Sequence, residues 1–567
     1  MRHLRSIARR NRRTIAVYLA CGLIIALLNS LSAGFFQRLI DHFSAGMLSL
    51  AEILIYGGIL LALCLLNYLT NVPDQRLTHG LFMDIKLAAM EKLSRIDYLS
   101  SQKLGTGVLI QRIESGAAAG RDMLFCFWLN LATNLLPAMA FSLLMIWRIS
   151  PMVTRVILLG YAAVFAITKL LLRALYRIKE RILIGEEGFN RRLVRAFTEL
   201  TVFRIHRRFG HETLAARAES DGIVGGKVRM TMIHEAFFTL FALIVTLFKI
   251  AILLYGWRTG ELTIGAIVAL LSLVDNAYQP VAIFNVEYVQ YRLNQAAFAR
   301  LAEFLDAPDD GQLASGRAVT TAALPLTVRD LAFRYDRQRV FDGLSLTVRP
   351  GEQIALVGES GSGKTTLVKL LIGLLKPTGG EIRLGGVPLS EIRLNSLYER
   401  LFYVSQDSPI FDGTLRENLI FSGDATPEAL LNALKCVQLD SWFAQLPQGW
   451  DTPLGERGVT LSGGERQRLA LARLWFTDAD VVVLDEATSA LDSVTEAAVM
   501  DALMRYLRGR TVLSIVHRLE TLPAYPRILV FDGGKIVGDG AHGDLMQTCV
   551  AYRGLHEAAD REAVHSV

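Results

Sequence analysis

The residues with the clearest chemistry form a glycine-rich loop between an apolar run and a helical run. The loop reads Gly358-Glu-Ser-Gly-Ser-Gly-Lys-Thr-Thr366, which fits the pattern G-x-x-x-x-G-K-T. Its glycines let backbone N–H groups curl around phosphate oxygens, and the start of the next helix adds positive partial charge. Lys364 can reach the β- and γ-phosphates of a nucleotide, and the Thr365 hydroxyl can hold Mg²⁺. We therefore predict a nucleotide phosphate site formed by Gly358, Ser360, Gly361, Ser362, Gly363, Lys364, Thr365 and Thr366.

Two adjacent carboxylates follow a second apolar run, Val481-Val-Val-Leu-Asp485-Glu486. Asp485 suits Mg²⁺ held through water, and Glu486 can polarise a water that attacks the γ-phosphate. Many buried strands end in an acid, so the pattern is informative mainly because it lies downstream of a phosphate loop.

A second glycine turn begins a long helical run, Leu461-Ser-Gly-Gly-Glu-Arg-Gln-Arg468. Ser462 is a good N-cap, which is the plain structural explanation. A helix N-terminus also binds anions. Two anion sites for one nucleotide make sense if two copies of the domain face each other and share nucleotides.

The chain that must position these residues is long and apolar. It has 567 residues, of which 52% are hydrophobic, with a mean hydropathy of +0.34 and a net charge of +6. Such a length needs at least two domains. We expect a membrane domain over residues 1–306, a polar linker over 307–325 and an α/β nucleotide-binding domain over 326–567. The five cysteines are isolated, which favours neither a metal cluster nor a disulfide framework.

Apolar runs of membrane-spanning length predict six transmembrane helices, near residues 14–39, 51–70, 123–147, 151–172, 236–256 and 263–284. Six arginines precede the first run, which is too long for a signal peptide and lacks a small-residue cleavage site. The long loops after the second and fourth runs are basic. The positive-inside rule therefore places the N-terminus, both loops and the nucleotide domain in the cytoplasm. This placement accounts for the basic charge, so we set nucleic-acid binding aside.

The two long loops are helical in composition over residues 75–96 and 173–198, with tips near 100–107 and 198–204. Two charged residues interrupt the spans. Lys249 and Asp275 form either an ion pair between helices or a contact with substrate, and the sequence favours neither. We expect the asparagines in or near spans to form helix–helix hydrogen bonds, namely Asn29, Asn67, Asn130, Asn134 and Asn276.

Taken together, these motifs resemble ABC transporters. The motifs occur in the family's order: Tyr335, the phosphate loop, Gln406 after Leu401-Phe-Tyr-Val-Ser405, LSGGERQR, VVVLDE, Ser489-Ala-Leu-Asp492 and His517. Six spans before one ATPase domain resemble exporter-type half-transporters, such as lipid A flippases and bacterial multidrug exporters. The resemblance covers essentially the whole chain. It is specific in the ATPase motifs and rests on layout in the membrane half.

The resemblance implies roles for individual residues. Tyr335 would stack on adenine, and Gln406 would touch Mg²⁺ and the attacking water and relay nucleotide state to the membrane half. His517 would hold the γ-phosphate. Asp492 would bridge the two domains, although both Tyr335 and Asp492 also fit a role in fold maintenance. The residues implied to close on the nucleotide of the opposite chain are Ser462, Gly463 and Gly464.

Further segments resemble the parts that couple the two halves. Thr452-Pro-Leu-Gly-Glu-Arg-Gly458 resembles the exporter-specific loop, and the two loop tips resemble coupling helices. One departure is the proline-rich segment Glu520-Thr-Leu-Pro-Ala-Tyr-Pro526, which we do not expect to affect catalysis.

The family further implies ATP and Mg²⁺ as cofactors and a multi-pass protein of the bacterial inner membrane. One motif set per chain implies two chains, with a homodimer favoured and a heterodimer possible. The implied function is ATP-driven export or flipping of an amphipathic small molecule, lipid or peptide by alternating access. Alternatives are an importer on the same fold, for example of a siderophore, and an ATP-gated channel, which Glu486 and His517 disfavour. Peptide export with leader cleavage is disfavoured because no protease-like domain precedes the first span.

Overall fold

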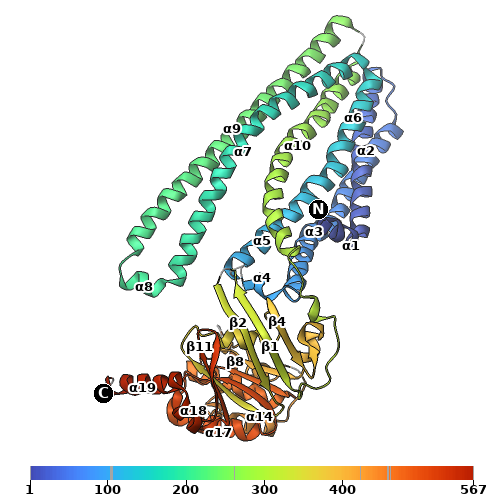
Figure 1. Cartoon of the computed structure of the whole chain (residues 1–567). Helices are drawn as coiled ribbons and strands as arrows, with labels where there is room; N and C mark the ends of the chain where they lie inside the picture. Colours follow the sequence, from blue (N-terminus) through green and yellow to red (C-terminus); the bar gives the residue numbers. More distant parts are fainter. Residues whose placement is uncertain are drawn as a thin grey trace. The chain divides into compact units, whose positions relative to one another are not determined.

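In the computed structural model of the chain, the described residues are 2–102, 106–260, 262–336, 338–421, 423–455, 459 and 461–565. The chain forms two compact units, drawn in Figure 1. The first contains Met1–Ser94 and Leu104–Ala307. The second contains Pro308–Val567 and also the short segment Arg95–Lys103. A piece of the first long loop therefore packs with the second unit rather than with the helices that flank it in the sequence.

The first unit is helical (Figure 1). Its elements are α1 (Arg2–Arg10), α2 (Arg12–Ser44), α3 (Leu50–Leu93), α5 (Thr106–Asp122), η1 (Met123–Leu129), η2 (Leu131–Leu135), α6 (Leu136–Ile149), α7 (Pro151–Thr198), α8 (Leu200–Ile205), α9 (Phe209–Thr259) and α10 (Ile264–Leu305). The stretches η1 and η2 have π-type hydrogen bonding within an otherwise continuous helical run from α5 to α6.

Five helical stretches among the described residues are long and apolar enough to cross a membrane. They are Arg12–Ser44, Leu50–Leu93, Leu109–Ile149, Phe209–Thr259 and Ile264–Leu305. The fourth predicted span lies on α7, where the described apolar part is the shorter Pro151–Ala162. Most side chains over 163–174 lie outside the described set, so the fourth predicted span stays a prediction.

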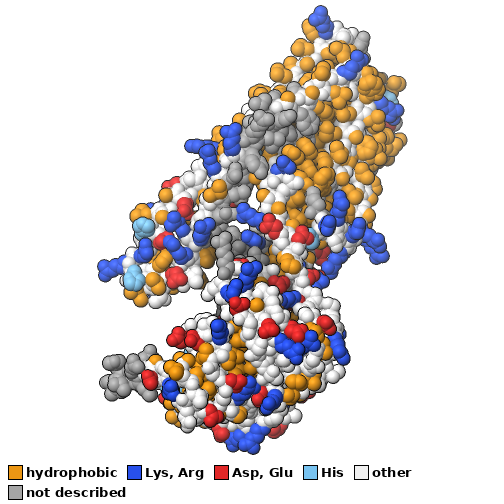
Figure 2. Space-filling model, viewed as in Figure 1, with side chains coloured by type: hydrophobic (Ala, Val, Ile, Leu, Met, Phe, Trp, Pro, Cys, Tyr) orange, Lys and Arg blue, Asp and Glu red, His pale blue; other side chains and the backbone are white. Residues whose placement is uncertain are grey.

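Hydrophobic side chains gather on the surface of this unit where α2 and α6 run (Figure 2). Exposed examples on α2 and α3 include Val17, Ile24, Leu54, Leu61 and Leu65. Water does not favour such a surface, whereas acyl chains do. Lys and Arg side chains instead gather around the α8 end of α7 and α9 (Figure 2). The first unit is therefore a membrane domain with a basic, polar end.

The predicted helical extensions are confirmed. Helix α3 runs to Leu93 and α7 runs to Thr198, so both continue far beyond the length that a bilayer needs. The short helix α8 occupies the second predicted tip, and α7 and α9 run side by side on either side of it (Figure 1). At the first tip lies α4 (Tyr98–Gln102), and the rest of that tip, residues 103–105, lies outside the described set.

Capping residues set where the long helices begin. Ser49 and Glu52 form a capping box at the start of α3. Thr263 caps α10 by accepting a hydrogen bond from Ala266 N, and its hydroxyl donates to Asp41 Oδ2 at 2.9 Å. Asp41 Oδ1 also accepts from Gly265 N at 2.9 Å, so the end of α2 is tied to the start of α10.

The helical core centres on Tyr278, which is fully buried on α10. Its ring stacks on Phe248 and meets Tyr161 edge-on, and its hydroxyl donates to Ile157 O at 3.1 Å. A Cβ at Gly160 would lie 2.0 Å from the Tyr278 hydroxyl oxygen, so only glycine permits this approach. Small residues allow close helix contacts of this kind in membranes.

The second unit is α/β and contains two main sheets. The antiparallel sheet has the order β2 (Gln338–Val348), β1 (Leu326–Tyr335), β4 (Gly379–Leu384), β5 (Val387–Pro388). The six-stranded sheet has the order β12 (Lys535–Gly540), β11 (Arg527–Asp532), β3 (Gln353–Gly358), β10 (Thr511–Ile515), β9 (Val481–Asp485), β6 (Leu401–Val404). Its strands are parallel except for β12. A small hairpin pairs β7 (Gly413–Thr414) with β8 (Pro453–Leu454).

Helices and short 3₁₀ turns complete this unit. They are α4, α11 (Lys364–Leu371), α12 (Leu394–Tyr398), α13 (Leu415–Leu419), α14 (Pro427–Cys436), α15 (Asp440–Phe443), α16 (Gly463–Ala472), α17 (Ser493–Tyr506), α18 (His542–Thr548), α19 (Val550–His565), η3 (Gly311–Leu313), η4 (Leu389–Glu391), η5 (Gly449–Asp451), η6 (Arg473–Phe476) and η7 (Leu519–Ala524). The predicted fold class, a helical membrane domain joined to an α/β P-loop ATPase domain, is confirmed.

Register in the parallel sheet brings the two chemical motifs to one edge. Ile515 on β10 pairs with Leu356 on β3 and with Asp485 on β9. The carboxyl ends of β3 and β9 therefore reach the same level, on either side of β10. Ligands bind at this edge of open α/β sheets.

The segment Arg95–Lys103 packs on the second unit through α4. Tyr98 and Leu99 pack against its hydrophobic core, and Lys369 of α11 lies over the Tyr98 ring at 5.8 Å. Backbone contacts hold the segment next to the start of the chain's second half, since Asp310 N donates to Arg95 O at 2.7 Å. Lys376 secures Asp310 in turn through a 2.7 Å ion pair.

Candidate nucleotide site

The phosphate loop joins β3 to α11, as the sequence predicts, and its glycines have the conformations that it needs. Gly358, Gly361 and Gly363 all have positive φ, at 149°, 82° and 104°. A Cβ at Gly358 would lie 2.1 Å from Phe531 O, and one at Gly363 would lie 2.8 Å from the Phe341 ring. Larger residues at these two positions would clash as well as strain the backbone. Ser360 and Gly361 are exposed at the tip of the loop, and Thr366 lies in the first turn of α11.

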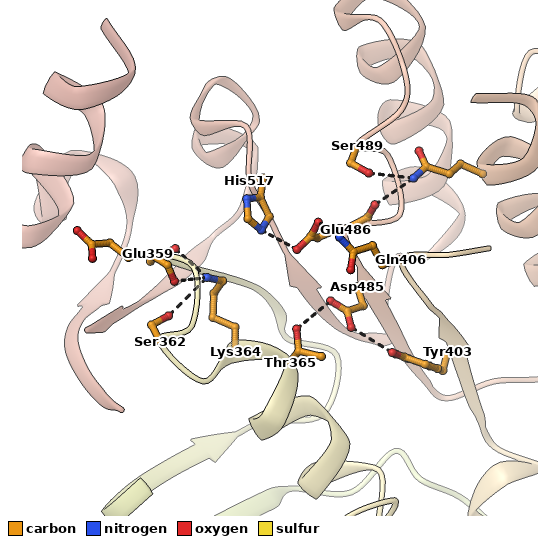
Figure 3. Close-up of polar contacts among 12 residues, drawn as sticks. Glu359, Ser362, Lys364, Thr365, Tyr403, Gln406, Asp485, Glu486, Ser489 and His517 are labelled. Carbon is orange, nitrogen blue, oxygen red and sulfur yellow. Dashed lines mark hydrogen bonds and ion pairs between the residues drawn. The ribbon is translucent and has the colours of Figure 1, made fainter. Parts of the chain in front are cut away.

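Lys364 folds back over its own loop (Figure 3). Its Nζ donates to Gly358 O at 2.7 Å and Glu359 O at 2.9 Å, and it lies 3.4 Å from Ser362 Oγ. The residue is only 5% exposed. Burial lowers its pKa, while the carboxylates of Glu486 and Asp485 act in the opposite direction. A buried cation held by neutral carbonyls is ready to exchange them for phosphate oxygens.

Asp485 is the most deeply buried carboxylate of the site, at 3% exposure. Its two oxygens lie against two hydroxyls: Tyr403 Oη at 3.1 Å and Thr365 Oγ1 at 3.4 Å (Figure 3). Burial raises the pKa of Asp485, and the neighbouring charge of Glu486 adds to this, although both hydroxyls partly offset it. A nearby cation would relieve this unfavourable burial.

These residues fit a magnesium ion. Carboxylate and hydroxyl oxygens are the hard donors that Mg²⁺ prefers, and Asp485 and Thr365 place one of each side by side. Gln406, the third predicted metal contact, lies on the Glu486 side of the site rather than against Asp485. The hydroxyls that contact Asp485 are neutral, so a bound cation would add favourable charge directly beside this buried carboxylate.

Glu486 is held from two sides. Gln406 Nε2 donates to its Oε2 at 2.7 Å, and His517 Nε2 lies 2.7 Å from its Oε1 (Figure 3). The residue has φ of 52°, a left-handed conformation that is uncommon for a residue other than glycine. Backbone strain of this kind concentrates at functional sites. The structure thus brings together all three residues predicted to be catalytic.

The signature turn makes contacts within its own chain. Ser462 caps α16 by accepting from Glu465 N at 3.2 Å, while its backbone N–H and its hydroxyl both donate to Glu465 Oε2 at 2.8 Å. Gly464 packs close to the Ala490 carbonyl. None of the described contacts joins Ser462, Gly463 or Gly464 to the phosphate loop. The structural explanation, a capped helix, accounts for these contacts in a single chain.

Tyr335 and Asp492 also lie apart from the catalytic cluster in the described contacts. Tyr335 is half-buried at the end of β1, and its ring meets Phe333 edge-on at 4.9 Å. Asp492 caps α17 by accepting from Thr495 N at 2.9 Å, and this backbone hydrogen bond holds the pKa of Asp492 below its usual value. Of the exporter-type loop, Glu456, Arg457 and Gly458 lie outside the described residues.

Two residues of the site escape the sequence analysis. Tyr403 donates a hydrogen bond to Asp485. Its position in the run that leads to Gln406 was a sequence signal that could have identified it. Gln467 lies within the signature and donates to Ser489 Oγ at 2.9 Å and toward Glu486 O at 3.4 Å. Its Oε1 accepts from Ala490 N at 2.8 Å. The start of α16 is thereby connected to the backbone of the catalytic glutamate.

Comparison with known proteins gives matches over both units. The family described as ABC transporter matches residues 341–489, which include the phosphate loop, Asp485 and Glu486. An ATP-dependent lipid A-core flippase of Neisseria meningitidis is 38% identical over 338 residues, which are 59% of this chain and 54% of the flippase. A protein of Bacillus subtilis named uncharacterized ABC transporter ATP-binding protein YwjA is 35% identical over 324 residues, 57% of this chain and 56% of that protein.

These alignments span about half the length of the curated relatives. A solved structure of a bacterial Atm1-family ABC exporter with ATP bound covers 98% of this chain and 99% of its own, with a TM-score of 0.84 and 24% identity. The match in structure extends over both units and establishes the fold. Residues 341–489 therefore belong to an ATP-binding domain, and the helical unit has the fold of an exporter's membrane domain.

Proposed function

Because this chain joins an ABC transporter domain to the fold of an exporter-type half-transporter, we propose that it is an ATP-driven transporter that exports or flips an amphipathic molecule. The observation that carries the proposal is the clamped Glu486 beside Asp485 and the phosphate loop, on a chain with membrane-spanning helices. A regulatory nucleotide sensor does not need a positioned base, whereas a pump does.

The chain's own residues divide the work of hydrolysis. The loop N–H groups and the start of α11 hold phosphate oxygens, and Lys364 transfers from the Gly358 and Glu359 carbonyls to the β- and γ-phosphates. Thr365 and Asp485 would hold Mg²⁺, with Gln406 as a further contact, and the ion would neutralise charge that develops on the phosphates. His517 orients Glu486, whose carboxylate accepts a proton from the attacking water.

In this proposal, two chains are needed to form each complete ATP site. Ser462 and the two glycines after it serve the nucleotide of a partner copy, and Asp492 lies at the junction of the two ATPase domains. Their lack of described contacts with their own phosphate loop supports this assignment. ATP favours the closed dimer through its higher affinity for that state, and hydrolysis resets it. The basic α8 end of α7 and α9 supports a cytoplasmic location for that end. The proposal also assigns the ATPase domain to the cytoplasm and the chain to a bacterial inner membrane.

The test is Glu486→Gln in the purified chain reconstituted in lipid. We expect ATP binding to be retained while hydrolysis falls at least ~10²-fold, as for loss of a positioned base. The closed dimer should accumulate with ATP. Glu399→Gln, at an exposed position on the same domain, is the matched control and should hydrolyse ATP normally. Near-normal hydrolysis by Glu486→Gln would reject the assignment. In inverted vesicles, ATP-dependent uptake of substrate into the lumen would indicate export, and release would indicate import.

A further inference from the structure

The membrane unit contains a cavity in which polar side chains lie among apolar ones, although its helices are mainly apolar. It has a volume of ≈ 240 Å³ and lies between α2, the stretch η2–α6 and α10. The polar side chains that line it are Asn29, Ser30, Asn134, Ser142, Asn276 and Gln279. Each helix contributes through one face, as in Asn134, Ala138 and Ser142 at four-residue spacing. Polar groups inside a bilayer are costly, and such groups usually serve function.

Helix–helix hydrogen bonds explain only part of this set. Asn130 donates to Glu287 Oε1 on α10 at 2.6 Å, which confirms that prediction. Asn134 donates to Asn130 Oδ1 at 2.6 Å, which lies on the same helical run. The described contacts contain no such bond for the side chains of Asn29, Asn276 or Gln279, nor for Asn67 outside the cavity.

The cavity wall also contains one unpaired buried hydroxyl. Ser142 is fully buried, lines the cavity, and its Oγ has no hydrogen-bond partner among the described residues. An unpaired buried polar atom is expensive, because it has lost its water without gaining a partner. The amides of Asn29, Asn276 and Gln279 offer more unused donors and acceptors around the same space.

The existing hydrogen bonds determine what the cavity presents at Asn134. The Glu287 carboxylate accepts from Asn130 Nδ2, so Asn130 turns its Oδ1 toward Asn134. Asn134 then uses its Nδ2 on this oxygen, which leaves its own carbonyl oxygen available as an acceptor. A ligand group with hydroxyl or amide N–H donors would satisfy it.

The cavity carries no charged side chain in its described wall. Asp275 precedes Asn276 in the sequence, but Lys249 Nζ neutralises it at 2.7 Å. Dehydrating an ion without a counter-charge costs far more than dehydrating a neutral polar group. The wall therefore favours an uncharged ligand over a phosphate or a carboxylate. The volume suits a head group rather than a whole drug-sized molecule, because pockets for drug-sized ligands have volumes of roughly 300–1,000 Å³.

We propose that this cavity is a binding site for the uncharged, hydroxyl- or amide-bearing head group of the transported amphiphile. The inference rests on the proposed transport function and narrows its substrate class. Ile25, Leu135 and Ile283 line the same cavity, so apolar contacts are available next to the polar ones. The head group binds through the amides of the wall, namely Asn29, Asn276 and Gln279.

The test measures binding directly, without ATP, on the full chain in lipid nanodiscs. The probes are monoglucosyl dioctanoylglycerol and dioctanoyl phosphatidate, which share acyl chains and differ in the charge of the head group. We expect the glucolipid to bind at least ~10-fold more tightly, which corresponds to about one well-made hydrogen bond. Equal or tighter binding of the phosphatidate would overturn the proposal.

Substitutions locate the site. Asn276→Leu and Gln279→Leu should each weaken glucolipid binding by ~5–10-fold. Asn67→Leu is the matched control, an exposed amide on the membrane-spanning α3 outside the cavity, and should bind as the unmodified chain does. Gln279 is exposed, so its replacement leaves the core intact, and thermal unfolding verifies this for each variant. Unchanged binding in both cavity variants would reject the site. Because no ATP is present, that result would leave the proposal of ATP-driven transport to the Glu486→Gln experiment.

Discussion

The imidazole Nε2 of His517 lies 2.7 Å from Glu486 Oε1, while the carboxylate's other oxygen accepts from Gln406. The glutamate that follows the metal-binding aspartate is thus oriented by a residue on a different part of the domain. His517 is the second residue after β10. This strand lies between β3, which leads into the phosphate loop, and β9, which ends at Asp485. The geometry of His517 is that of a positioning group for the base.

Replacing His517 should therefore lower turnover without abolishing nucleotide binding. We expect His517→Ala to reduce ATPase activity by ~10²-fold, because a misplaced base loses most of its contribution. The affinity for ATP, measured with a fluorescent analogue, should change by a smaller factor than the ATPase rate. His211→Ala on α9, an exposed histidine of the membrane unit, provides the control. Equal rates in both variants would show that His517 does not position Glu486.

Tyr403 should tune the magnesium requirement through Asp485. Its hydroxyl lies 3.1 Å from Asp485 Oδ2 and helps to hold that carboxylate in place. We expect Tyr403→Phe to raise the Mg²⁺ concentration for half-maximal ATPase by ~3–10-fold, about the net effect of one ordinary hydrogen bond. Tyr398→Phe, another half-buried tyrosine of the same domain, should leave the Mg²⁺ dependence unchanged. A fall in maximal rate at unchanged Mg²⁺ dependence would contradict this role.

The phosphate loop and the carboxylate pair could be predicted because each is a local pattern with its own flanking strand. The fold class followed from alternating apolar runs and from spans of bilayer length. Tyr403 was missed because its role depends on pairing between β6 and β9, where Tyr403 pairs with Val483 two residues before Asp485. Sequence separation of about eighty residues hides such a neighbour, and register alone reveals it.

Polar residues in spans show a second limit. An asparagine in an apolar run signals a need for a hydrogen bond, but the pattern does not name the partner. The expectation holds for Asn130, whose partner Glu287 is far away in the sequence. For Asn276 the structure instead shows an amide at the wall of a cavity. The packing of Arg95–Lys103 with the second unit was likewise invisible, since composition indicates only that the loop is helical.

Two composite ATP sites in a homodimer can be tested by complementation. Lys364→Ala removes the phosphate lysine, and Ser462→Arg blocks the signature turn, so each variant alone should be inactive. A mixed dimer combines both defects in one site and leaves the other site intact. We expect such dimers, isolated with two different tags, to recover about half of the activity, as two-fold symmetry requires. No recovery, together with ATPase that appears only after a second gene product is added, would indicate a heterodimer.

The ion pair between Lys249 and Asp275 in the membrane unit can be tested by a double-mutant cycle. Lys249 Nζ lies 2.7 Å from Asp275 Oδ2, and the long lysine stem lets the ammonium group reach the neighbouring helix. The ion pair is thus the arrangement in the structure. Lys249→Met and Asp275→Asn should each destabilise the protein by ~1–3 kcal/mol, because each leaves one charge without a partner in an apolar surrounding. The double variant should recover much of that loss, as measured by unfolding in detergent.

The control pair is Lys227 and Glu186, 2.7 Å apart on the extensions of α9 and α7, where exposure to water limits the coupling to ~0.5 kcal/mol. Additive losses for Lys249 and Asp275 would mean that the contact contributes nothing. If substrate-stimulated ATPase fell while stability stayed constant, the two residues would belong to a substrate path instead.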